Sequence, residues 1–314
     1  MNTTVNPKSG NDTATALAIQ QRCFLVGCVR SGTTLLQSLL AAHPLVTSFP
    51  ESMFYRIAVG QAATRFRGVP VRGIRSHVGE MLREAHWRVG LATPLGRSRI
   101  ETFLHEMDRD DCIDMFPKNS RSLKAQSDAF VRILDTLALE QGKTVWIEKS
   151  PCHLGYTDII EREVPGALFI HIVRDGIDVV ASITDAANKY GGHWKTNWGK
   201  LDLAIQQWNH TVNQTRRQQH KPNHHVVTYE RMVDDTPGVL KELCEFMQIE
   251  YLESMLDDYR SAARNVILEK SAWKSGVFGE IKRDSGEKFR AIFTEEQQAY
   301  IRDRLTPIRP GEFG

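Results

Sequence analysis

The sequence predicts an α/β protein of three layers, α/β/α, in which helices cover both faces of a central parallel sheet. The main observation is that continuous apolar runs alternate along the chain with segments of helical periodicity. The composition agrees with a globular protein, because 41% of the residues are hydrophobic and 25% are charged. A chain of 314 residues is long enough for one large domain with a substantial core.

The first predicted strand and helix flank a glycine-containing turn. The apolar run CFLVG, residues 23–27, predicts a buried strand, and residues 33–43 predict a helix that ends before Pro44. The leucines of this helix recur at helical spacing: Leu35, Leu36, Leu39 and Leu40. The turn therefore lies between a buried strand and a helix N-terminus.

The same alternation continues toward the C-terminus. Further strands are expected at 143–148, 167–173 and 224–229, and helices at 125–141, 175–187, 236–247 and from 294 onward. Asp175 is the expected N-cap of the helix after the third strand. The helix at 236–247 is expected to have Thr236 as its N-cap and Pro237 at its first position. The last helix begins at Thr294, where Gln297 completes a capping box.

The domain organisation follows from the stretches that do not fit this alternation. Residues 1–21 are polar and small, and they predict a flexible N-terminal arm before a single domain at 22–314. Two insertions, near 52–122 and 189–199, are expected to lie over the strand ends, where an acceptor pocket would form. The basic, glycine-punctuated stretch at 270–290 is expected to be a loop.

Charge and cysteine content exclude several classes of function. Lys and Arg number 40 against 38 Asp and Glu, and the net charge of +2 argues against general binding of nucleic acid or membrane surfaces. The five scattered cysteines form no CxxC pair, so neither a zinc site nor a disulfide framework is expected. Residues 1–21 have no signal-peptide pattern, and an apolar run of transmembrane length is lacking. The cytoplasm is therefore the expected compartment.

The turn after the first strand, GCVRSGTTLLQ at 27–37, indicates an anion site. Gly27 and Gly32 have the spacing of a nucleotide-triphosphatase P-loop, but Thr33 stands where that motif has its lysine. A strand-to-helix turn of this kind directs backbone N–H groups at a phosphate-like group, and Arg30 and Thr34 add donors. The structural alternative is an ordinary tight turn. Without the lysine, metal-dependent phosphoryl transfer is disfavoured.

The third strand leads into a second candidate anion site, FIHIVRDGIDVVAS at 169–182. Arg174 ends the strand, and Ser182 lies about two turns into the next helix. An arginine at a strand end can bind a phosphate through two N–H groups, and a helical serine can add a hydroxyl. The alternative is an ion pair between Arg174 and Asp178 beside an ordinary helical serine.

Together the two segments resemble the sulfotransferases that use 3′-phosphoadenosine 5′-phosphosulfate (PAPS), including bacterial members and the tyrosylprotein branch. YERMVDD at 229–235 and WKSGVFGEI at 273–281 are similar to two further family segments. The resemblance extends from about residue 22 to residue 305 and leaves 52–122 unmatched. It implies the P-loop-like sulfotransferase fold, PAPS as co-substrate and no metal requirement.

The resemblance also implies which residues bind the nucleotide. The 5′-phosphosulfate would be held by one continuous turn, made of Arg30, Ser31, Gly32, Thr33 and Thr34. Arg174 and Ser182 would hold the 3′-phosphate, and Tyr229 is a candidate neighbour of the adenine or else a core tyrosine. The tail residues Lys274, Ser275 and Gly276 would close over the 3′-phosphate, although many members have Arg-Lys-Gly there.

Catalysis of sulfuryl transfer requires cations at the leaving group and a base at the acceptor. Arg30 is one candidate cation, and Lys149 is similar to the family's second catalytic lysine unless it is a surface lysine paired with Glu148. Two bases compete. Glu51 is placed like the glutamate of the tyrosylprotein sulfotransferases, whereas His153 follows the lysine by four residues instead of the two found in cytosolic small-molecule members.

The sequence therefore predicts a PAPS-dependent sulfotransferase that acts on a hydroxyl or amine of a small-molecule, lipid or sugar acceptor. In-line displacement would release adenosine 3′,5′-bisphosphate. The alternatives are a P-loop small-molecule kinase and a non-catalytic nucleotide-binding module. No nucleic-acid partner is expected, and a homo-oligomer stays open.

Overall fold

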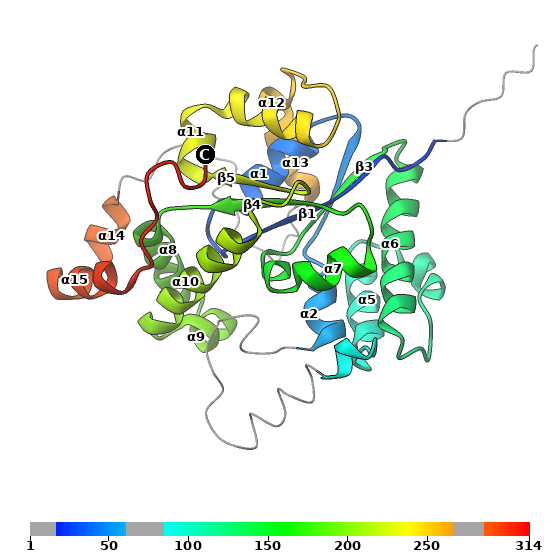
Figure 1. Ribbon diagram of the computed structural model, residues 1–314, viewed down its shortest axis with the longest axis horizontal. Helices are drawn as coiled ribbons and strands as arrows, with labels where there is room; N and C mark the ends of the chain where they lie inside the picture. Colours follow the sequence, from blue (N-terminus) through cyan, green and yellow to red (C-terminus); the bar gives the residue numbers. More distant parts are fainter. Residues whose placement is uncertain (1–16, 61–84, 267–285) are drawn as a thin grey trace, which may run out of the picture.

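The computed structural model describes residues 17–60, 85–266 and 286–314. At its centre is a five-stranded sheet whose neighbouring strands are all parallel, in the order β2-β3-β1-β4-β5. The strands are β1 (Gln21–Gly27), β2 (Val46–Phe49), β3 (Val145–Lys149), β4 (Leu168–Val173) and β5 (His224–Thr228). Helices lie on both faces of the sheet (Figure 1). The predicted three-layer α/β/α class is therefore confirmed.

One face of the sheet packs against α1 (Thr33–Ala41), α12 (Thr236–Phe246) and α13 (Met255–Val266), with α11 (Tyr229–Asp234) directly after β5. Alternate strand residues turn toward these helices, because successive side chains of a strand point to opposite faces. Leu25, Ile147 and Ile170 lie in this layer and are fully buried. Burial on both faces explains why the central strands β1, β3 and β4 contain continuous apolar runs.

The opposite face packs against α6 (Leu123–Glu140), α7 (Thr157–Glu163) and the short η2 (Pro151–Tyr156). Phe24 is central to this layer, with ring centroids 5.4 Å from Trp146 and 5.7 Å from Phe169. The elements α2 (Phe54–Val59), α5 (Leu95–His105) and η1 (Asp110–Met115) extend the same apolar cluster.

A third apolar cluster lies around α8 (Gly176–Tyr190), α9 (Gly192–Trp198) and α10 (Leu201–Gln218). The C-terminal helices α14 (Glu287–Ile292) and α15 (Glu295–Arg304) pack beside it (Figure 1). Trp194 and Trp198 belong to this cluster and are 8% and 5% exposed, so both act as anchors of the 189–199 segment. The predicted cap of α8 is confirmed, since Asp175 Oδ1 accepts from the Ile177 N–H at 2.8 Å.

The strand β2 was not predicted from the sequence. This strand has four residues, two of them polar. It lies at the edge of the sheet, where a strand needs fewer apolar residues than at the centre. Gln37 of α1 secures it by donating to the Ser48 hydroxyl at 2.8 Å and to the Phe49 carbonyl at 2.9 Å. Glu51 therefore follows the carboxyl end of a strand.

Several boundaries also differ from expectation. The N-cap of α12 is Asp235 rather than Thr236, because Asp235 Oδ1 accepts from the Gly238 N–H and the Thr236 hydroxyl donates to the Met232 carbonyl. β1 begins at Gln21, inside the predicted arm, whose residues 1–16 lie outside the described part. The end of the predicted loop at 270–290 is helical from Glu287. The capping box of Thr294 and Gln297 is confirmed.

None of the helices in the described ranges has the length and apolar character needed to cross a bilayer.

Candidate active site

The carboxyl ends of the strands bring the predicted site residues to one edge of the sheet. β1 leads into the turn that contains Arg30, and β2 leads to Glu51. Lys149 is the last residue of β3, while Arg174 and Tyr229 directly follow β4 and β5. Because the strands are parallel, these ends lie side by side, which is where α/β proteins bind ligands.

The turn after β1 contains two residues in the left-handed backbone conformation. Arg30 has φ 70° and Gly32, the N-cap of α1, has φ 90°, so both are left-handed. Only Gly fits at position 32, because a Cβ there would lie 2.4 Å from Tyr229 Cδ2. The Cβ of any residue at position 27 would lie 2.6 Å from the Ile172 carbonyl oxygen. These contacts explain both glycines of the motif.

The donors of this turn fit an anionic group. Ser31 is fully buried, and its Oγ has no hydrogen-bond partner among the described residues. Thr33 and Thr34 begin α1, and the N-cap Gly32 provides no side chain to satisfy the first N–H groups of the helix. The first turn carries no acidic side chain, so the positive end of the helix dipole is not offset locally.

Arg30 joins the turn to the second candidate segment. Its Nε donates to Ser182 Oγ on α8 at 3.0 Å. Burial lowers the pKa of Arg30 below its ordinary value; Tyr190 and Asp185 oppose this shift, and the positive Arg174 adds to it. Two guanidinium groups held close together in a partly buried place favour a bound anion between them.

Arg174 lies against Tyr229, whose ring centroid is 4.3 Å from the guanidinium carbon. Its backbone carbonyl accepts from Trp208 Nε1 at 2.9 Å. The ion pair expected as the alternative is also present, with 3.7 Å between Arg174 Nη2 and Asp178 Oδ2, although both side chains are mostly buried. The segment therefore combines an ion pair with the contact to the turn through Ser182.

Glu51 and Lys149 form the central charged contact of the site. Lys149 Nζ donates to Glu51 Oε1 at 2.5 Å. The Lys149 side chain is 1% exposed and that of Glu51 is 23% exposed, so the pair lies at the boundary between core and solvent. The expected alternative, a surface lysine paired with Glu148, is not what the structure shows. In β1, Leu25 is the register partner of Lys149, so the pair lies beside the strand that enters the anion loop.

His153 is buried, and hydrogen bonds occupy both of its ring nitrogens. Its Nε2 accepts from the Tyr55 N–H at 3.2 Å, and its Nδ1 contacts Glu148 Oε2 at 2.9 Å. An amide can only donate, so the ring proton must be on Nδ1 and point to Glu148. The two candidate bases are thus differently placed: Glu51 is partly exposed beside Lys149, whereas His153 is inside the protein. The predicted tail residues Lys274, Ser275 and Gly276 lie outside the described residues.

A family model described as a sulfotransferase family matches residues 23–253. This chain belongs to the sulfotransferase family. Among solved structures, the sulfotransferase domain of the Synechococcus PCC 7002 olefin synthase superposes with a TM-score of 0.56 and 20% identity, covering 93% of this chain and 97% of that one. The sulfotransferase domain from the curacin biosynthetic pathway gives 0.52 and 18%, with coverages of 91% and 97%. Both likenesses show a shared fold. No curated protein matches the sequence.

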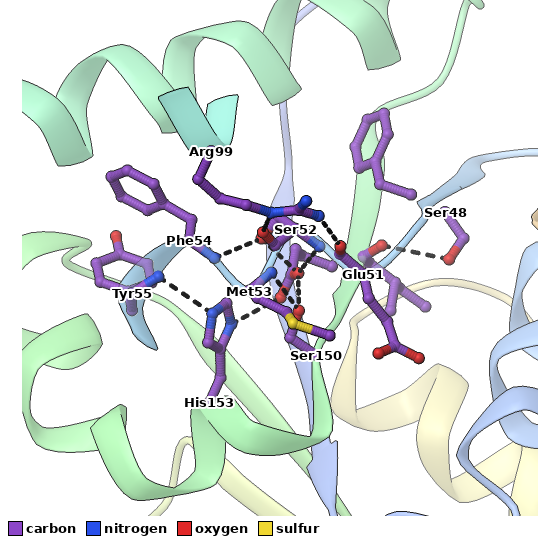
Figure 2. A network of polar contacts seen from close by, with 12 residues as sticks. Ser48, Glu51, Ser52, Met53, Phe54, Tyr55, Arg99, Ser150 and His153 are labelled. Atoms are coloured by element: carbon purple, nitrogen blue, oxygen red, sulfur yellow. Dashed lines mark hydrogen bonds and ion pairs between the residues drawn. The ribbon is translucent and has the colours of Figure 1, made fainter. Parts of the chain in front are cut away.

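The sulfotransferase holds Glu51 with an arginine that the sequence analysis did not single out. Arg99 of α5 donates to the Glu51 carbonyl at 2.7 Å and to the Ser52 carbonyl at 2.5 Å. Figure 2 shows Arg99 over the backbone of this turn, while the Glu51 carboxylate points away from it. The sequence signal was the abundance of arginines at 52–122, but many positions share it. The partners of Arg99 are backbone carbonyls, and no side-chain motif in the sequence indicates such contacts.

Gly32 gives a prediction about the stability of the sulfotransferase. Gly32→Ala should lower the free energy of unfolding by about 2–4 kcal/mol, since the new Cβ meets the Tyr229 ring at a strained φ. Gly142→Ala is the matched control, because its φ is 69° but nothing lies within 4 Å. That variant should lose about 1 kcal/mol. Urea denaturation measures both, and equal losses would contradict a role for the Tyr229 contact.

Proposed function

We propose that this sulfotransferase moves a sulfuryl group from PAPS to a hydroxyl or amine of a small-molecule, lipid or sugar acceptor. The observation that carries the proposal is the contact of Glu51 with Lys149 beside the anion-binding turn. It brings a proton acceptor and a hydrogen-bonding cation to one point. A site that only binds nucleotide needs the turn but not this pair.

PAPS, when bound, supplies an activated sulfuryl group whose leaving group is a nucleotide phosphate. Ser31, Thr33, Thr34 and the first N–H groups of α1 would hold its 5′ end, as the buried Ser31 hydroxyl supports. Arg174 and Ser182 would hold the 3′-phosphate, and Tyr229 would lie near the adenine. Arg30 contacts Ser182, so the two phosphate-binding segments act as one site.

The chain's own residues divide the catalytic work. Lys149 and Arg30 donate hydrogen bonds where negative charge develops, which lowers the barrier to displacement. Glu51 accepts the proton of the acceptor, and its partial exposure leaves it accessible to one. His153 is less suited to this role, because its accepting nitrogen already receives the Tyr55 N–H.

The acceptor would lie between the two insertions. Arg99 on α5 reaches the backbone of Glu51, and Trp194 on α9 has its ring 5.9 Å from the guanidinium carbon of Arg30. Each insertion therefore contacts one of the proposed catalytic residues. We assign acceptor binding to these segments within a single domain.

Calorimetry with adenosine 3′,5′-bisphosphate, ADP and ATP, without magnesium, tests the donor. We expect clear preference for the bisphosphate, and Arg174→Ala should weaken its binding about 100-fold with little change for ADP. Arg109→Ala is the control, since Arg109 pairs with Asp111 and Glu140 at the end of the helix that leads to the amino end of β3. A preference for ATP that grows with magnesium would instead favour a kinase.

A further inference from the structure

The beginning of α2 is connected to a single buried carboxylate. The Ser52 N–H donates to Glu148 Oε1 directly, at 3.1 Å. The next three backbone N–H groups reach the same carboxylate through one side chain each. Met53 N–H donates to Ser150 Oγ at 2.9 Å, Phe54 N–H to Ser52 Oγ at 3.2 Å and Tyr55 N–H to His153 Nε2 at 3.2 Å. Figure 2 shows Ser52, Ser150 and His153 around the beginning of α2, with these contacts as dashed lines.

The direction of every proton in this network follows from its geometry. Each intermediate side chain has one proton, and each already accepts a backbone N–H, so its own proton is free to point onward. Ser52 Oγ and Ser150 Oγ donate to Glu148 Oε1 at 2.7 Å and 2.6 Å, and His153 Nδ1 donates to Oε2 at 2.9 Å. Glu148 therefore accepts four hydrogen bonds and has to be ionised.

The charge of Glu148 is consistent with this arrangement. Burial raises the pKa of its carboxyl, but His153, through its proximity and hydrogen bond, and the Ser150 and Ser52 hydroxyls lower it more, so that the pKa lies below its ordinary value. The N-cap residue Met53 is left-handed, at φ 50°, and offers no side-chain cap of its own. Glu148, which lies on β3, caps the helix instead.

The contact between Glu51 and Lys149 is made by the sequence neighbours of two residues in this network, Ser52 and Glu148. Glu148 and Lys149 are consecutive in β3, and Glu51 and Ser52 are consecutive in the turn before α2. Glu148 binds Ser52, and Lys149 binds Glu51. The buried link therefore determines where the backbone of Glu51 lies relative to Lys149.

We propose that Glu148 is a positioning residue, which caps α2 through Ser52, Ser150 and His153 and so holds Glu51 against Lys149. The role in catalysis rests on the proposed sulfuryl transfer, whereas the cap does not. Glutamine cannot replace Glu148. If its amide nitrogen faces His153, the ring must accept there, and the Tyr55 N–H then meets a second donor. If the amide is flipped, its nitrogen meets the three donors at Oε1.

The test compares Glu148→Gln with Glu161→Gln in the full chain. Glu161 is a matched control, because it also accepts from an imidazole, His224 Nε2 at 2.9 Å, and from Lys221 and Asn223, but near the amino end of β5. The readouts are hydrogen exchange at residues 52–55, binding of adenosine 3′,5′-bisphosphate, and transfer of a radiolabelled sulfate group from PAPS to probe acceptors. The probes are 1-octanol, 2-naphthol and octylamine.

In Glu148→Gln we expect exchange at 52–55 to be about tenfold faster, kcat to fall about 100-fold and bisphosphate affinity to stay within about twofold. Glu161→Gln should leave all three unchanged. Ser150→Ala provides a milder variant in case Glu148→Gln does not fold. It removes the acceptor of the Met53 N–H and one of the four hydrogen bonds to Glu148, and it should lower kcat about tenfold.

The proposal is overturned if Glu148→Gln shows wild-type hydrogen exchange at 52–55, or if its kcat is unchanged. It is also overturned if Glu161→Gln loses as much kcat as Glu148→Gln. If the wild-type protein transfers nothing from PAPS and does not bind the bisphosphate, the proposed function fails. Hydrogen exchange then still decides whether Glu148 caps α2.

Discussion

We expect Lys149→Ala to lower the rate of sulfuryl transfer about 1000-fold while binding of adenosine 3′,5′-bisphosphate stays within about twofold. The physical reason is that the Lys149 side chain is buried at the end of β3, where it is held against Glu51. A donor aimed at developing charge in such a place stabilises the transition state more than the ground state. Single-turnover transfer from radiolabelled PAPS and calorimetry measure the two quantities.

The control for this variant is Lys143→Ala. Lys143 precedes β3 and donates to the Val46 carbonyl at the amino end of β2, so it tests the loss of a half-buried lysine away from the site. We expect its transfer rate to match that of the wild type. If Lys149→Ala instead loses bisphosphate affinity as much as rate, Lys149 binds the nucleotide uniformly and is not catalytic. If the protein is instead a non-catalytic module, no transfer is expected from the wild type or from either variant.

If Glu51 is the base, we expect Glu51→Gln to lower transfer to an alcohol about 1000-fold, because the glutamine amide cannot accept the acceptor's proton. The glutamine keeps the size of the side chain and one oxygen near Lys149. With an acceptor that is already ionised at the assay pH, such as p-nitrophenol, no proton has to be removed. The loss should then shrink to about tenfold. The ratio of rates for the two acceptors in wild type and variant is the measurement.

His153→Ala provides the contrast that separates a base from a positioning group. Removing His153 releases the Tyr55 N–H and one bond to Glu148, so we expect slower transfer to both acceptors by a similar factor. Glu242→Gln, on α12 beside Arg231, is the control and should behave as the wild type. If His153→Ala spares the ionised acceptor and Glu51→Gln does not, the assignment of the base is reversed. Full activity in both variants would remove both candidates.

Much of the fold could be predicted because its central strands are buried on both faces. β1, β3 and β4 contain apolar runs, β5 combines two histidines with two valines, and the alternation of these strands with helices predicted a parallel sheet. β2 could not be predicted, since it is a short edge strand secured by Gln37 of a helix rather than by apolar residues. The N-cap of α12 was placed one residue late because Asp235 and Thr236 are both good caps.

The candidate site could also be predicted only in part from the sequence. The residue types and spacing of GCVRSGTTLLQ and IVRDGIDVVAS by themselves predicted two anion-binding segments after two strands. Glycine at 27 and 32 is a local requirement of backbone conformation and close approach, and such requirements are visible in the sequence.

Only the tertiary structure decided which side chains meet. It brought Glu51 to Lys149, Arg99 to the carbonyls of the turn, and Glu148 to the beginning of α2. These partners are 47 or more residues apart in the sequence, and several of them are backbone groups. Every residue has such groups, so they leave no sequence pattern. Their pairing arises from the parallel register that aligns the strand ends, because burial leaves each polar group there in need of a partner.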